Sequence, residues 1–179
     1  MISGDAVKTW ICLLRAVNVG GTGKLPMAEL RRLCEEIGLE QVRTYIASGN
    51  VVCRSRHDEA GVKAALEEAL AGYVGKPVGV LVRSSKEMAA VLAGNPFAEV
   101  PGNRCVTIFL DEAPPPDVLD HIRGRKDERV ALGRREIYVH YGDGMADSKL
   151  RIPAAANGTA RNMNTVARLV GMAQEIAGD

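Results

Sequence analysis

The amino-acid sequence predicts an α+β protein with two halves, each following the order β-α-β-β-α and each containing an antiparallel sheet packed against helices. Three observations lead to this fold class. The chain has 179 residues, which is enough for one large hydrophobic core or two small ones. Hydrophobic residues make up 46% and charged residues 25% of it, the balance of an ordinary globular protein. Short apolar runs alternate along the chain with segments whose apolar residues recur at helical spacing, and this coarse order occurs twice.

The first strand and the first helix are predicted near the N-terminus. Residues 7–16 contain an apolar run without alternation, which is typical of a buried strand. A Gly-rich loop follows over residues 18–25, and Pro26 occupies a favoured first position of a helix. Apolar side chains then recur at helical spacing until Gly38, a residue type that commonly ends a helix.

A hairpin, two more helices and a strand complete the first half. Residues 42–47 and 50–54 predict two strands. Ser48-Gly49 joins them in a tight turn, because Gly tolerates the positive φ that such turns require. The remaining elements of this half are an amphipathic helix over 58–74, a strand over 78–82, and a helix that runs from an N-cap at Ser84-Ser85 to about residue 93. This order is that of a ferredoxin-like fold, in which helices cover one face of an antiparallel sheet.

The second half begins after a segment rich in turn signals. Residues 95–104 contain Asn-Pro and Pro-Gly pairs, which favour loops. We therefore expect a first ferredoxin-like half over 1–94, a linker over 95–104 and a second ferredoxin-like half over 105–179. The second half is predicted to contain, in order, a strand over 105–110, a helix around 117–123, two hairpin strands over 128–132 and 136–141, a long loop over 142–158 and a final helix over 163–176.

Composition argues against several classes of protein. The net charge is +1 and aromatic residues are only 4%, so the chain has no strong attraction to nucleic acid and few surfaces on which bases could stack. Residues 1–21 lack both a membrane-spanning apolar stretch and a signal-peptide cleavage pattern. The four cysteines form no Cys-x-x-Cys pair, and the three histidines are isolated from one another. We therefore expect a cytoplasmic protein with free buried thiols, without a metal ion, a cofactor or membrane association, and with nucleic acid as an unfavoured partner.

The polar motifs of this chain lie where predicted elements begin or end. Four of them supply neutral or positive hydrogen-bonding groups and no carboxylate, over residues 15–21, 44–51, 148–150 and 159–165. This combination suits an anion or a polar small molecule. The candidate ligand-binding residues are Arg15, Asn18, Ser48, Asn50, Lys149, Arg161, Asn162 and Asn164.

The Gly-rich loop satisfies neither of two phosphate-binding patterns. A P-loop requires G-x-x-x-x-G-K-[ST], but Asn18 stands at the first Gly and Leu25 at the hydroxyl position. A dinucleotide fingerprint requires a third Gly where Pro26 stands. The loop amides, Lys24 and the N-terminus of the following helix still suit an anion. An ordinary connection between a strand and a helix explains the loop equally well.

The segment before the last helix is the strongest binding candidate, although it has a structural explanation too. One side chain, Thr159 or Asn162, would cap the helix. Arg161 and further polar residues supply more donors than a cap requires, and a helix N-terminus that bears an Arg is a ready anion site. Residues 48–50 are more typical of a hairpin turn, and Lys149 of an exposed loop.

The motifs as a set resemble a bacterial family called domain of unknown function 1697. The resemblance rests on residues 13–21, 44–51, 95–97, 133–138, 148–150 and 159–165, which follow in the right order over nearly the whole chain. Met163 stands where the family often has Trp, and Val17 where it often has Ile, and both are apolar exchanges. The resemblance implies an α+β fold of two ferredoxin-like halves and no particular activity.

Three functions therefore stay open. The first is binding of a small anionic or phosphorylated ligand by the Arg, Asn, Ser and Lys side chains named above. The second is a structural or protein-interaction module, in which the same residues form a buried hydrogen-bond network. The third is RNA binding, for which Tyr45 and Tyr138 lie on predicted strands, without an RNP-like pattern around them. The residues identify no acid, base or nucleophile of an enzyme.

Overall fold

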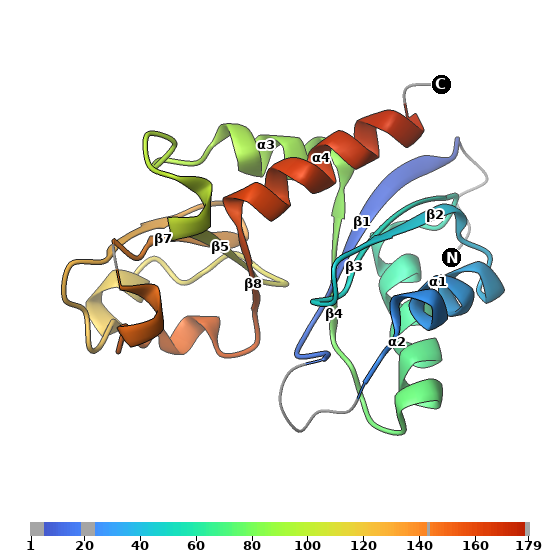
Figure 1. The fold of residues 1–179 in the computed structure, drawn as a ribbon, viewed down its shortest axis with the longest axis horizontal. Coiled ribbons are helices and arrows are strands. Elements are labelled where there is room, and N and C mark those ends of the chain that lie inside the picture. Colours follow the sequence, from blue (N-terminus) through green and yellow to red (C-terminus); the bar gives the residue numbers. More distant parts are fainter. Residues whose placement is uncertain (1–5, 19–23, 143, 178–179) are drawn as a thin grey trace. The chain divides into compact units, whose positions relative to one another are not determined.

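The structure is a computed structural model that describes residues 6–18, 24–142 and 144–177 (Figure 1). The chain divides into two compact units. Unit 1 comprises Met1–Ala89 and Arg168–Asp179, and unit 2 comprises Ala90–Ala167.

The divisions between the units fall inside two helices. In sequence the chain passes from unit 1 to unit 2 within α3 (Ser85–Ala93) and returns within α4 (Met163–Ala177). The described residues of α4 from Arg168 onward therefore belong to unit 1, whereas the sequence predicts them as part of the second half. The physical reason is that the last part of α4 covers a face of the unit 1 sheet, as described below.

Unit 1 is built on a four-stranded sheet in which all neighbouring strands are antiparallel. Its strands are β1 (Lys8–Leu14), β2 (Glu40–Tyr45), β3 (Asn50–Ser55) and β4 (Val80–Ser84), in the spatial order β2-β3-β1-β4. The helix α1 (Met27–Glu36) follows β1, and α2 (Glu59–Val74) follows β3. This order of elements and strands is the ferredoxin-like arrangement that the sequence predicts for the first half.

The hydrophobic core of unit 1 lies between one face of this sheet and the two helices α1 and α2 (Figure 1). Alternate residues of β1 face the core, among them Trp10 and Cys12, and Leu30 and Leu66 contribute from the helices. The last part of α4 contacts the other face. Two arginines of the sheet bind it, since Arg43 donates to the Glu175 carboxylate at 2.6 Å and Arg54 donates to the carbonyl of Ile176 at 3.2 Å.

Local sequence signals explain where the elements of unit 1 begin and end. The Asp58 carboxylate accepts a hydrogen bond of 2.8 Å from the backbone N–H of Gly61 and so caps α2. Gly75 follows α2 with φ +87°. Gly49 has φ +91° in the turn between β2 and β3, as the hairpin prediction requires.

Unit 2 contains a second antiparallel sheet with the same order of strands along the chain. Its strands are β5 (Cys105–Phe109), β6 (Arg129–Leu132), β7 (Glu136–His140) and β8 (Thr159–Asn162), in the spatial order β6-β7-β5-β8. Two antiparallel sheets with helices confirm the predicted α+β fold class. A single-turn 3₁₀ helix, η1 (Gly102–Arg104), lies inside the predicted linker.

The connections of unit 2 differ from the prediction in two places. The helix expected around 117–123 is one 3₁₀ turn, η2 (Val118–His121). It ends there because the backbone of Arg123 pairs instead with that of Arg151, with N···O distances of 2.9 and 2.7 Å. The segment before α4, which the sequence predicts to lead directly into that helix, forms strand β8, whose residues pair with β5.

One face of the unit 2 sheet is covered by irregular chain rather than by a long helix. Its apolar residues include Val106, Ile108 and Ile137. Against them packs the connection between β7 and β8, which contains the short 3₁₀ helices η3 (Met145–Asp147) and η4 (Pro153–Ala155). On the opposite face the Tyr138 hydroxyl donates to the carbonyl of Val91 at 2.8 Å.

Candidate functional site

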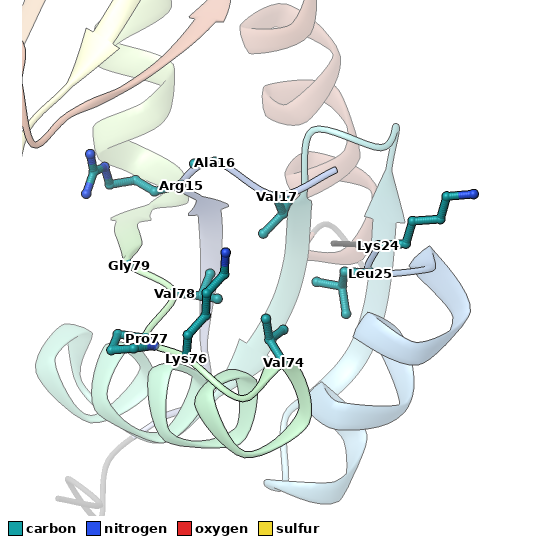
Figure 2. A pocket seen from close by; sticks show the side chains of 10 residues that line it. All are labelled: Arg15, Ala16, Val17, Lys24, Leu25, Val74, Lys76, Pro77, Val78 and Gly79. Carbon is teal, nitrogen blue, oxygen red and sulfur yellow. The ribbon is translucent and has the colours of Figure 1, made fainter. Parts of the chain in front are cut away.

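Unit 1 contains a cavity of about 200 Å³ at the C-terminal end of β1 (Figure 2). Among the described residues that line it, three side chains are cationic and none carries a carboxylate. The lining residues are Arg15, Ala16, Val17, Lys24, Leu25, Val74, Lys76, Pro77, Val78 and Gly79.

The strand order brings Arg15 and Lys76 to the same cavity from distant parts of the sequence, and Lys24 lines it from the opposite side (Figure 2). Because β1 and β4 are antiparallel neighbours, the end of β1 lies beside the segment that precedes β4. The backbone N–H of Arg15 donates to the carbonyl of Gly79 at 2.9 Å. Lys76 lies on that segment, just after α2, and Lys24 precedes α1. A Cβ placed on Gly79 would lie 3.3 Å from Cδ of Arg15, so the arginine stem rests against glycine backbone.

The cavity has an apolar floor and a charged rim. Val17, Leu25 and Val78 are buried, with exposed fractions of 6%, 2% and 7%. Lys24 and Lys76 are exposed, while Arg15, also on the rim, is half-buried. In Figure 2 the Lys76 side chain reaches up toward the end of β1, whereas the Lys24 side chain extends outward from the cavity.

Two helix ends border this cavity, and their dipoles oppose each other. The positive N-terminus of α1 begins two residues after Leu25, and the negative C-terminus of α2 ends at Val74. Each helix end corresponds to roughly half an elementary charge. Because the two contributions are of opposite sign and similar size, the three cationic side chains set the sign of the local potential, which is positive.

Asn18 holds the chain on both sides of the Gly-rich loop. Its side-chain amide donates to the carbonyls of Leu25 at 2.9 Å and of Ala47 at 2.8 Å, and its Oδ1 accepts from the N–H of Leu25 at 2.6 Å. Residues 19–23 of the predicted loop lie outside the described residues. Asn18 is not a lining residue of the cavity, but it fixes Leu25, which is.

Ser48 and Asn50 belong to the turn between β2 and β3. Asn50 is fully buried, and its amide donates to the carbonyl of Tyr45 at 2.9 Å and to the Ser48 hydroxyl at 3.0 Å. A Cβ on Gly49 would lie 2.8 Å from a methyl group of Val17, so the turn packs directly against the floor of the cavity. These contacts are those of the predicted hairpin turn.

The four remaining candidate residues belong to unit 2. Lys149 lines a second cavity of about 380 Å³, whose lining also includes Asp127, Glu128 and Asp147. The neighbouring Ser148 hydroxyl hydrogen-bonds to the Glu128 carboxylate, and this bond, with backbone N–H donors, holds the pKa of Glu128 below its usual value. The mixed charges of this cavity do not favour an anion.

Arg161 lies on β8 and is almost completely buried. It donates to the Thr159 hydroxyl at 2.8 Å and to the carbonyl of Ala160 at 2.9 Å. Burial of the guanidinium lowers the pKa of Arg161 to about 10. Asn162 accepts a bond of 2.9 Å from the N–H of Thr165 and so caps α4, one of the two capping interpretations.

Asn164 lies on the first turn of α4 and packs against η1. Asn164 is exposed, and its Oδ1 lies 2.2 Å from where a Cβ on Gly102 would be, so a side chain at position 102 would require the Asn164 side chain to move. The predicted cluster is thus divided into four residues in unit 1 and four in unit 2. In unit 1, Arg15 lines the cavity and Asn18, Ser48 and Asn50 support the chain around it.

Lys76 is a cavity residue that the sequence analysis did not identify. No motif surrounds it, since it lies in a short connection between a helix and a strand. The strand order of a ferredoxin-like sheet was the available signal, because it places the connection before the fourth strand beside the end of the first.

Among the described residues no group of three or more His, Cys, Asp or Glu side chains is arranged to hold a metal ion, and no described helix has the length and apolar character needed to cross a membrane.

Comparison with known proteins identifies the family of this chain. No curated protein matches the sequence. A solved structure, the conserved bacterial protein SP0830 from Streptococcus pneumoniae, is similar with 27% sequence identity and a TM-score of 0.78, over 94% of this chain and 99% of that one. Residues 7–138 match the model of the family described as protein of unknown function (DUF1697), and the chain therefore belongs to this family.

Proposed function

We propose that unit 1 binds a small anionic or phosphorylated ligand in the cavity at the end of β1. The observation that carries this proposal is the set of three cations, Arg15, Lys24 and Lys76, around a cavity whose described lining residues include no carboxylate. A concave surface of one charge sign attracts and concentrates ligands of the opposite sign.

The charges alone predict a weak site. One pair of unit charges at about 4 Å in water is worth roughly 1 kcal/mol, so pairs with Arg15 and Lys76 give roughly 2 kcal/mol, and Lys24, whose side chain extends outward, adds less. A millimolar complex requires roughly 4 kcal/mol. The planar guanidinium of Arg15 adds charge-assisted hydrogen bonds of about 1.5–3 kcal/mol, which makes submillimolar binding of a phosphate group attainable.

The proposed site differs from the eight-residue cluster predicted from the sequence. It keeps Arg15, adds Lys24 and Lys76, and assigns a supporting role to Asn18. Ser48 and Asn50 support the same region from the neighbouring turn. Participation of Lys149, Arg161, Asn162 and Asn164 in a ligand site stays a prediction.

A specific observation favours the structural alternative within unit 2. Arg161 and Asn162 bond to groups of their own strand and helix, as a hydrogen-bond network that serves the fold would. For RNA binding, one of the two tyrosines is unsuited to stacking, because Tyr138 is 5% exposed and its hydroxyl is bonded within unit 2. These contacts support a structural role for Arg161 and Asn162 in unit 2, and the ligand proposed here is assigned to Arg15, Lys24 and Lys76 of unit 1.

Isothermal titration calorimetry with inorganic phosphate and small phosphate monoesters tests this proposal. Lys76→Gln removes one cavity charge and should weaken binding about fivefold, the factor that corresponds to roughly 1 kcal/mol. Arg15→Gln removes a charge and the guanidinium hydrogen bonds together, so it should weaken binding more than Lys76→Gln does. Lys8→Gln is the matched control, because Lys8 is exposed at the opposite end of β1 and its loss changes the net charge equally. Equal weakening by all three variants would reduce the effect to general charge, and absence of binding to the unaltered protein would reject the site.

A further inference from the structure

The floor of the unit 1 cavity is apolar and continuous with the hydrophobic core. Val17, Leu25 and Val78 belong to the core cluster of unit 1, and Val74 packs against that cluster. Side chains fixed in a packed core keep their positions, so this floor is a rigid apolar surface rather than a mobile one. A bare inorganic anion would leave this surface without a complementary partner.

The cations lie at the rim rather than at the floor. Lys24 and Lys76 are exposed, and lysine side chains carry their charge at the end of a long apolar stem. The cavity therefore changes from charged at its opening to apolar at its base (Figure 2). We infer that its ligand is an amphipathic anion, a phosphate monoester or carboxylate whose compact apolar body contacts Val17, Val74 and Val78. This inference rests on the proposed function and specifies its ligand class.

The size of the cavity limits the apolar body. About 200 Å³ corresponds to roughly seven water-sized groups at ~30 Å³ each, so an apolar body of up to about six carbon atoms fits when the charged group lies at the rim. Cavities that enclose drug-sized ligands begin at ~300 Å³, so a dinucleotide exceeds the space available. Burial of one methylene group strengthens binding about fourfold, and this factor makes the inference measurable.

A homologous series of ligands tests the inference by calorimetry on the full chain. The series consists of inorganic phosphate and the methyl, propyl, butyl and hexyl monophosphates, with the carboxylates of the same chain lengths as a second arm. We expect the affinity to rise about fourfold per methylene until the body fills the cavity and then to level off. The arm with the stronger binding identifies the charged group as phosphate or carboxylate.

Substitutions separate the apolar contact from the charge contact. Val74→Ser should flatten the rise with chain length and leave the affinity for inorganic phosphate unchanged, because Val74 is a half-buried floor residue without charge. Lys76→Gln should weaken every member of the series by the same factor. Val100→Ser, which alters a half-buried valine of unit 2, should change neither the rise of affinity with chain length nor the affinity for inorganic phosphate.

The outcomes distinguish this inference from the proposed function. If inorganic phosphate binds as tightly as hexyl phosphate, the amphipathic ligand is rejected while the anion site stands. If no member of either arm binds, the anion site itself is rejected. A rise with chain length that Val74→Ser leaves intact would place the apolar contact elsewhere and overturn the inference.

Discussion

Replacing Asn18 with alanine should lower the free energy of unfolding of unit 1 by about 4 kcal/mol. The Asn18 side chain makes three hydrogen bonds, two with Leu25 and one with Ala47. At roughly 1 kcal/mol each, their loss accounts for about 3 kcal/mol. Leu25 is 2% exposed, so water does not readily replace the two bonds to its backbone, whereas the bond to Ala47 is exposed to solvent. The remaining ~1 kcal/mol comes from the backbone, since Asn18 has φ +55°, which Asn tolerates better than Ala.

Asn18→Gly separates the two contributions. Glycine adopts positive φ without strain, so this variant should lose only the roughly 3 kcal/mol of the hydrogen bonds. The difference between the alanine and glycine variants then measures the backbone contribution. Asn157→Ala is the control, because Asn157 is exposed in unit 2 and should be replaceable without loss.

Urea unfolding followed by tryptophan fluorescence is the suitable assay. The chain has one tryptophan, Trp10, and it is buried in the core of the unit that contains Asn18. With a slope of about 1–3 kcal/mol per molar urea, a loss of ~4 kcal/mol moves the midpoint by one to several molar. An unchanged midpoint for Asn18→Ala would show that the amide does not hold the loop. Equal midpoints for the alanine and glycine variants would show that the positive φ carries no cost.

The remaining predictions concern a turn, a buried carboxylate and a buried cation. Gly49→Ala should lower the free energy of unfolding by about 2–4 kcal/mol, because residue 49 has φ +91° and its new Cβ would lie 2.8 Å from a core methyl group. The same urea assay measures this loss. The lowered pKa of Glu128 stabilises the fold above the usual glutamate pKa, and this contribution disappears as pH falls through the lowered value. Ser148→Ala should therefore raise the pKa of Glu128, which an NMR titration measures, and should lower the free energy of unfolding at neutral pH but not in acid. An unchanged pKa of Glu128 would show that the Ser148 hydrogen bond is not the cause of the shift. Arg161→Ala should lower the free energy of unfolding by roughly 1–3 kcal/mol, because it leaves buried hydrogen-bond partners unsatisfied. The melting temperature followed by circular dichroism measures this loss, and a variant as stable as the parent would refute the structural role.

Local signals in the sequence predict much of unit 1. An apolar run predicts β1, and the capping Asp58 with Gly75 beyond the end frames α2. The turn at Gly49 follows from the φ that only glycine adopts without strain. Each of these features depends on residues within a few positions of one another, and such information is present in the sequence itself.

The errors in unit 2 arise from contacts between distant residues. The helix expected around 117–123 stops after one turn because Arg123 pairs with Arg151, a partner that no local pattern indicates. The four residues of β8 include Ala160 and Asn162, residue types that are less common in strands. They form one because β5 lies alongside them, with Phe109 opposite Thr159. Sequence periodicity over four residues could not reveal that pairing.

The candidate site shows the same division between local and long-range information. Arg15 and Lys24 flank a visible Gly-rich loop, so the sequence identifies Arg15 as a candidate residue and Lys24 as a loop cation that suits an anion, outside the eight-residue cluster. Lys76 joins them only through the antiparallel pairing of β1 with β4. The apolar floor was equally hidden, because Val17 and Val78 belong to the core and to the cavity at once.

The repeated strand order places an equivalent corner in both units, and the side chains there explain why the anion site is expected in unit 1 alone. In unit 1 the end of β1 lies beside the segment before β4, where Arg15 meets Gly79. The equivalent corner of unit 2 lies where β5 ends beside the start of β8, and a glycine, Gly158, stands there too. Gly158 packs against β5, since a Cβ on it would lie 2.7 Å from the backbone oxygen of Phe109. By the strand register Leu110 stands opposite Gly158, where unit 1 has Arg15 opposite Gly79, and two acidic residues follow Leu110. The topology thus provides the same corner twice, and the side chain opposite its glycine is cationic in unit 1 and apolar in unit 2.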